Sequence, residues 1–245
     1  MRIGVAGSGG NYKNAFSFCK AHGISALEVA FTHGVRMSRE KAREVGKLAV
    51  EYGIQLSVHA PYYVNLASID EEKQVSSVKR VLDSCDRAYY LGARCVVFHP
   101  GFYQKRNPDD VYPLIKRRIK ELMESVPEGV VLCPETTGKV SQFGTLEELL
   151  RLQEETGCGI CVDFAHMLAR YGSVDYKKIL EQLSEPIHAH FSGIQYGDKG
   201  EIRHIPTDRE EARRLLRLCK NKDITIINEG PDPFGEAAMM MELWP

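Results

Sequence analysis

Residues 95–135 read CVVFHPGFYQKRNPDDVYPLIKRRIKELMESVPEGVVLCPE. A short apolar run opens this stretch, a helical pattern follows over Pro108–Ser125, and a second apolar run ends it at Val130–Glu135. Two strands joined by a helix predict a parallel pair, because a parallel connection needs a crossover of a dozen or more residues.

The same alternation of strand and helix patterns extends over the whole chain. We expect strands at Arg2–Val5, Ala26–Ala30, Gln55–His59, Cys95–His99, Val130–Glu135, Gly159–Asp163, Ile187–Phe191 and Ile224–Glu229. Helical patterns lie at Asn11–Ala21, Ser38–Tyr52, Asp70–Leu91, Pro108–Ser125, Thr145–Glu155, Asp175–Leu183 and Asp208–Cys219, with a short helix near Gly235–Leu243. Eight strands that alternate with helices predict an α/β fold, a single (β/α)₈ TIM barrel domain covering residues 1–245. An open doubly wound sheet is the alternative, but Gly7-Ser8-Gly9-Gly10 does not match the dinucleotide-binding pattern G-x-G-x-x-G.

The composition is typical of a globular chain. Of the 245 residues 43% are hydrophobic, and no run approaches the roughly 18 apolar residues that span a bilayer. The N-terminus lacks the apolar segment of a secretory signal, so we expect a soluble, cytoplasmic protein without membrane contact. The net charge of −1 gives no polybasic surface for nucleic acid, and we infer no protein partner. Seven cysteines indicate reduced thiols, and Cys158 and Cys161 are interpreted as core residues rather than a redox or zinc pair.

Six consecutive strands, the third to the eighth, end in a histidine or a carboxylate. In a barrel these strand ends meet at one rim, where active sites lie. The sequence places no lysine or arginine at the strand ends, so the carboxylates would repel one another unless a cation neutralised them. We therefore predict a cluster of divalent metal ions, zinc or manganese, which imidazole and carboxylate ligands both suit. The predicted ligands are His59, His99, Glu135, Asp163, His166, His190, His204 and Glu229.

His188 lies on the same predicted strand as His190, two residues before it. The two side chains therefore point to the same face of the sheet. We expect His188 to lie one layer deeper in the barrel, as a core residue or as support for a ligand.

Several segments resemble the endonuclease IV family of apurinic/apyrimidinic endonucleases, within the xylose-isomerase-like barrels. They follow the family's order over nearly the whole chain. The matching segments are SVHAPYYVNLAS at 57–68, VFHPG at 97–101, PETTGKVSQFG at 134–144, CVDFAH at 161–166, His190 with Ser192, and Asn228-Glu229.

The resemblance implies an enzyme that holds three zinc ions and cleaves DNA 5′ to an abasic site with a metal-bridging hydroxide. One zinc would be held by His59, His99 and Glu135, a second by Glu135, Asp163, His190 and Glu229, and a third by His166 and His204. The catalytic carboxylates would be Glu135, Asp163 and Glu229. The substrate contacts would come from Tyr62, Arg203 and Arg36.

Two departures from the family pattern affect these expectations. The family carries an aspartate two residues before the histidine at 204, but this chain has Ile202 there. We expect the third site to be weak or empty, with Glu201 pointing elsewhere unless the loop changes register. The loop after the second strand is short, and Arg36 and Met37 are its candidates for insertion into a base stack.

Other functions stay open. A single-metal sugar isomerase or epimerase of the same barrel group would need only Glu135, Asp163, His190 and Glu229. The additional histidines His59, His99, His166 and His204 favour the phosphodiesterase. Another metal-dependent hydrolase, or a non-catalytic barrel that binds nucleic acid or a phosphorylated metabolite, completes the alternatives.

Overall fold

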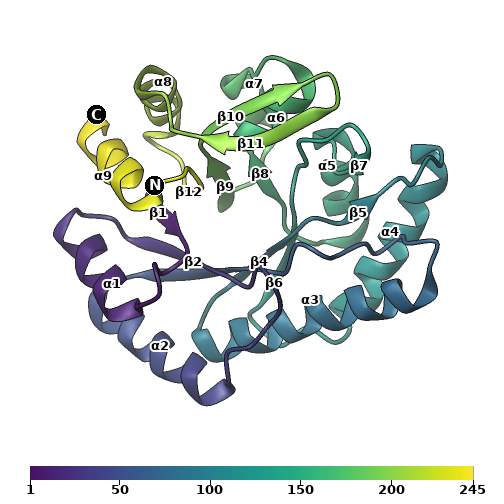
Figure 1. Ribbon diagram of the computed structural model, residues 1–245, viewed down its shortest axis with the longest axis horizontal. Helices are drawn as coiled ribbons and strands as arrows, with labels where there is room; N and C mark the ends of the chain where they lie inside the picture. The colour runs from purple at the N-terminus through teal and green to yellow at the C-terminus, as the bar shows by residue number, and fades with distance from the viewer. Residues whose placement is uncertain (245) are drawn as a thin grey trace.

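The computed structural model describes residues 1–244 and contains one eight-stranded sheet rolled into a barrel (Figure 1). Neighbouring strands are parallel, in the order β6-β4-β3-β2-β1-β12-β9-β8. The strands are β1 (Arg2–Ala6), β2 (Ala26–Ala30), β3 (Gln55–His59), β4 (Cys95–Phe98), β6 (Val131–Pro134), β8 (Cys161–Asp163), β9 (Ile187–Phe191) and β12 (Ile224–Asn228). The sheet ends meet where Glu135 bridges Cys161, and the Thr136 N–H donates to the Cys161 carbonyl at 3.0 Å. The predicted (β/α)₈ barrel is confirmed.

Helices connect the strands around the outside of the barrel (Figure 1). They are α1 (Tyr12–Ala21), α2 (Arg39–Tyr52), α3 (Glu71–Leu91), α4 (Pro108–Met123), α5 (Leu146–Thr156), α7 (Tyr176–Gln182), α8 (Arg209–Cys219) and α9 (Pro233–Leu243). Helix α5 begins with a complete capping box, in which Thr145 and Glu148 each accept the other's backbone N–H. The predicted helices are therefore present, with ends that differ by one or two residues.

Three features of the structure, one helix and two short strand pairs, were not predicted. Helix α6 (Phe164–Tyr171) starts directly after β8, without a loop, because the Asp163 side chain caps it by accepting the His166 N–H at 2.7 Å. Strands β10 (Gly193–Gly197) and β11 (Gly200–Ile205) form an antiparallel hairpin, and β5 (Gly101–Phe102) pairs with β7 (Gln142–Phe143). All three extend the carboxyl-terminal rim of the barrel.

The apolar core fills the space between the strands and the helices. Its largest fully buried side chains include Phe16, Phe98 and Phe164, and burying one such side chain stabilises a fold by about 1.5–3 kcal/mol. The seven cysteines are free, and both Cys158 and Cys161 are buried, as predicted. Over residues 1–244, no helix combines the length and the apolar character needed to span a bilayer.

Candidate metal centre

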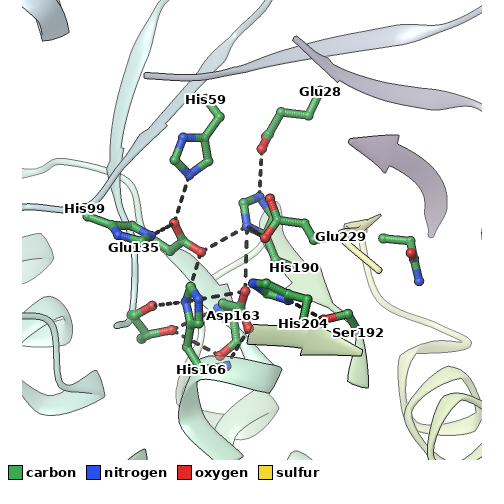
Figure 2. Close-up of polar contacts among 12 residues, drawn as sticks. Glu28, His59, His99, Glu135, Asp163, His166, His190, Ser192, His204 and Glu229 are labelled. Carbon is green, nitrogen blue, oxygen red and sulfur yellow. Dashed lines mark hydrogen bonds and ion pairs between the residues drawn. The ribbon is translucent and has the colours of Figure 1, made fainter. Parts of the chain in front are cut away.

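The eight predicted ligands converge at the carboxyl ends of the strands (Figure 2). They form three overlapping groups whose ligand atoms lie within 4.8 Å of one another. The groups are His59, His99 and Glu135; Glu135, Asp163, His190 and Glu229; and Asp163, His166 and His204. Because Glu135 and Asp163 each belong to two groups, the three groups form one continuous cluster.

Glu135 lies at the centre of this cluster, and its two carboxylate oxygens face different groups (Figure 2). Its Oε2 lies 3.1 Å from His59 Nε2 and 2.9 Å from His99 Nε2. Its Oε1 lies 3.0 Å from His190 Nδ1 and 3.4 Å from His166 Nδ1. Around a tetrahedral zinc ion with ligand distances of about 2.0–2.1 Å, neighbouring ligand atoms are about 3.3 Å apart. The spacing around Glu135 therefore fits a carboxylate that bridges two ions.

Hydrogen bonds orient three of the histidine rings. His59 Nδ1 donates to the Ala60 carbonyl at 2.8 Å, and His166 Nδ1 donates to the Thr136 carbonyl at 2.9 Å. His204 Nδ1 lies 2.6 Å from the Ser192 hydroxyl oxygen, which donates its own proton to the Gly193 carbonyl. Because each of these hydrogen bonds uses Nδ1, Nε2 is the nitrogen of each ring that can ligate a metal ion.

The two carboxylate oxygens of Asp163 have different roles. Its Oδ1 accepts the His166 N–H that starts α6, while its Oδ2 is buried and has no hydrogen-bonding partner among residues 1–244. An unpartnered buried carboxylate oxygen is unfavourable, because its desolvation is uncompensated. Its position between two ligand groups indicates a cation as the missing partner.

Glu28, on β2, is a buried carboxylate for which we predicted no role. Its Oε2 accepts the Ser57 hydroxyl at 2.7 Å and lies 3.0 Å from His188 Nε2. Its Oε1 lies 3.0 Å from His190 Nε2, and neither atom has another hydrogen-bonding partner. Glu28 therefore contacts the nitrogen of His190 that points away from Glu135. A single carboxylate inside an otherwise apolar strand was the signal that the sequence offered.

His188 occupies the deeper layer, as predicted, in contact with Glu28 and T-shaped against His190. Cys161 lies close enough to both histidines to complete a fourth possible ligand group. Burial raises the pKa of the Cys161 thiol well above its usual value. His190 belongs both to this lower group and to the central rim group, so the two layers are in direct contact.

The carboxylates and histidines of the cluster shift one another's pKa values. Burial raises the pKa of Asp163, whereas for Glu135 the opposing charges on His99 and His190 outweigh burial and hold its pKa well below the usual range. Burial acts to lower the pKa of His59, but the hydrogen bond and charge of Glu135 raise this pKa to about 9. In residues 1–244 no lysine or arginine forms an ion pair with these carboxylates, so protonated histidines occupy the role that metal cations would take.

The three predicted substrate residues lie in different places. Tyr62 is 57% exposed and lines a small cleft with His59, His204 and Glu229. Arg36 is exposed in the loop after β2, whereas Met37 is partly buried against the core and is not free to insert into a base stack. Arg203 is exposed on β11 and donates to the Gln195 side chain at 2.9 Å, outside the ligand groups.

Comparisons with known proteins show the family to which the chain belongs. A family model described as a xylose isomerase-like TIM barrel matches residues 16–209. The chain is 36% identical to the uncharacterized protein MJ0133 of Methanocaldococcus jannaschii, over 90% of this chain and 87% of that protein. It is 32% identical to the probable endonuclease 4 of Mycobacterium leprae strain Br4923, over 70% of this chain and 71% of the relative.

Solved structures share the barrel. SacUVDE superimposes with a TM-score of 0.79 at 16% identity, covering 99% of this chain and 97% of that one. Endonuclease IV from Thermus thermophilus gives 0.73 at 21% identity, over 100% and 98% of the two chains. D-psicose 3-epimerase from Clostridium cellulolyticum H10 gives 0.70 at 14% identity, over 99% and 95%. At these identities the structural likeness shows the fold alone, while the sequence matches show the relationship. The chain therefore belongs to the xylose isomerase-like TIM barrel family, and endonuclease 4 proteins are among its relatives there.

Proposed function

We propose that this chain is a metal-dependent phosphodiesterase, with zinc as its metal, that cleaves DNA 5′ to abasic sites. The observation that carries the proposal is the continuous cluster of eight ligands around Glu135. One metal ion needs about four ligands, so eight side chains in three overlapping groups support two or three ions. Seven free cysteines support a reducing, cytoplasmic setting.

The donor set fits zinc. It combines imidazole nitrogens and carboxylate oxygens, the buried Asp163 Oδ2 lacks any other partner, and the spacing around Glu135 matches a tetrahedral ligand shell. Zinc ions there would supply Lewis acidity and the positive charge that attracts a phosphodiester. The manganese ion accepts the same ligands.

The protein side chains have distinct roles in this proposal. Glu135 and Asp163 each serve two ligand groups and fix the spacing between them, while Glu229 closes the central group beside the cleft. Tyr62 lies exposed beside His59, with 6.0 Å between ring centroids, where it can pack on the sugar or base that enters the cleft. The exposed guanidinium groups of Arg36 and Arg203 would contact the DNA backbone.

A single-metal sugar epimerase is the second candidate. The group of Glu135, Asp163, His190 and Glu229 is complete without the other histidines, and the two glutamates could move protons between adjacent sugar carbons. The remaining ligands distinguish the two functions. An epimerase with one ion gives no reason for His59, His99, His166 and His204 to surround the same carboxylates.

Metal stoichiometry and cleavage of a defined duplex test the proposal. Protein purified without chelator is analysed by elemental mass spectrometry and then incubated with a duplex that contains one abasic site. We expect two or three zinc ions per chain and a nick 5′ to that site, with the Glu135→Gln variant as the inactive control. One metal ion without a nick would support the epimerase and a screen of ketoses. Several ions without a nick would keep the metal cluster but reject the substrate.

A further inference from the structure

The rim hairpin β10–β11 contains an irregularity next to the third ligand group. Its register runs Ile194 to His204 and Gln195 to Arg203, and then moves directly to Tyr196 opposite Glu201. Ile202 is thereby left without a partner, which is the signature of a β-bulge. A bulge changes which side chains of a strand face the core and which face solvent.

The bulge turns Ile202 outward and Glu201 inward. The Ile202 residue is 60% exposed, whereas the Glu201 side chain is only 17% exposed. Glu201 Oε2 lies 3.6 Å from His166 Nε2, the ring nitrogen that remains available as a ligand because Nδ1 is hydrogen-bonded to the Thr136 carbonyl. Glu201 was expected to point elsewhere unless the loop changes register. The hairpin does change register, and Glu201 faces the site.

Two glycines, Gly138 and Gly200, allow the hairpin to approach the loop after β6 closely. The Glu201 N–H donates to the Gly138 carbonyl at 3.1 Å. A Cβ atom at Gly138 would lie 2.7 Å from Glu201 Cβ and 3.2 Å from His166 Cδ2. A Cβ atom at Gly200, whose φ is +91°, would lie 2.0 Å from the Gly138 carbonyl oxygen. The close approach of the two backbones is what brings Glu201 to His166.

We propose that Glu201 is the carboxylate ligand of a third metal ion, together with Asp163, His166 and His204. This inference rests on the proposed metal cluster and adds the ligand that its third group needs for four-coordination. Two independent features point to a cation there. Within residues 1–244 the buried Asp163 Oδ2 has no hydrogen-bonding partner, and the Nδ1 atoms of His166 and His204 are hydrogen-bonded, which leaves both Nε2 atoms available as ligands. Glu201 would thus supply the carboxylate of the third position, although residue 202 is isoleucine.

Zinc titration of three proteins tests this assignment. Wild type, Glu201→Gln and the matched control Ile202→Asp are stripped of metal and titrated with Zn²⁺ against a chromophoric chelator. Bound zinc per chain is confirmed by elemental mass spectrometry. We expect Glu201→Gln to hold one zinc ion fewer, or to bind its last ion at least about tenfold more weakly. Ile202→Asp should match the wild type, because position 202 faces solvent.

A second variant keeps the Glu201 carboxylate but should move it away from His166. Gly138→Ala places a methyl group against Glu201 and should cause the same loss as Glu201→Gln, while circular dichroism reports that the barrel remains folded. Equal zinc binding in wild type and Glu201→Gln would overturn the role of Glu201, as would a higher zinc content in Ile202→Asp. If the wild type itself binds a single ion, the proposed function fails as well. If the wild type and all variants bind two zinc ions each, the third metal position is rejected but the proposed function is not.

Discussion

His190 presents Nδ1 to Glu135 and Glu229, at 3.0 and 3.4 Å, and presents Nε2 to Glu28. A carboxylate behind a metal-binding histidine fixes the tautomer and the ring orientation and raises the basicity of the ligating nitrogen. Ser57 and His188 hold Glu28 itself in place. The buried layer below the rim therefore decides which nitrogen of His190 is available to a metal ion.

This arrangement makes Glu28→Gln informative. The amide keeps the size of the side chain but removes its charge, so we expect zinc affinity at the central group to fall about 10–100-fold. Competitive zinc titration measures the loss, with Glu51→Gln on the exposed face of α2 as the matched control. An affinity equal to that of the control would mean that Glu28 acts only in packing.

At the scale of elements, Glu155 links two neighbouring helices of the barrel wall. Its Oε2 accepts from Lys116 at 2.9 Å and from Tyr112 at 3.0 Å, both on α4, and its Oε1 accepts from Arg151 on its own helix at 2.9 Å. The hydrogen bonds from Lys116 and Arg151 are the main reason that the pKa of Glu155 falls to about 2. A carboxyl in the unfolded chain titrates near about 4.3, so folding favours the ionised form.

The sign of the pH dependence follows from this shift. The stabilisation is present above about pH 4.3 and disappears as the pH falls through the folded-state pKa of about 2. We expect Glu155→Gln to lower the melting temperature by about 1–3 °C at pH 7, and the difference to shrink steadily below pH 4.3. Calorimetry at several pH values measures this, with Glu154→Gln, an exposed neighbour, as the control. A difference that stays constant down to pH 3 would contradict the assignment.

The elements also show where sequence reasoning succeeds. Strands such as β3 and β9 were predicted residue for residue, because short apolar runs between helical patterns have one interpretation in a parallel barrel. Helix α6 was missed because Asp163 both ends a strand and caps a helix, which leaves no loop to mark the boundary. The bulge at Ile202 was missed because its cause lies in the packing of Gly138 against Gly200, two positions far apart in the sequence. Local patterns predict elements, whereas contacts between distant backbones decide side-chain direction at the rim.

At the scale of the whole molecule, the convergence of the candidate ligands was predictable because the fold brings the carboxyl ends of all strands to one rim. Once eight strands close a barrel, a histidine or carboxylate at each carboxyl end must approach the others. All eight predicted ligands do so. Glu28 and Glu201 were not predicted, because the first lies within a strand and the second faces the site only through a bulge. The roles proposed for Glu28 and Glu201 depend on contacts between elements that only the closed barrel brings together.

Because the closed barrel holds these carboxylates close together, we predict that bound metal ions stabilise the whole fold. Glu28, Glu135 and Asp163 are buried together at and just below the carboxyl-terminal rim, and within residues 1–244 the basic side chains that pair with them are histidines. An ion that binds the folded chain and not the unfolded one adds about 2.7 kcal/mol when its free concentration is about 100 times the dissociation constant. For a chain of this size that corresponds to a rise of about 5–10 °C in the melting temperature.

Calorimetry of chelator-treated protein, before and after zinc is restored, measures this effect. We expect treatment with EDTA to lower the melting temperature by that amount and zinc to restore it, while magnesium restores less because it disfavours imidazole ligands. The Glu135→Gln variant should show a smaller zinc-dependent rise, because it lacks the carboxylate shared by two ligand groups. Its apo form need not be less stable than the apo wild type, since the substitution also removes a buried charge. A melting temperature that does not respond to EDTA or zinc would mean that protonated histidines already satisfy the buried carboxylates and that the cluster does not hold metal.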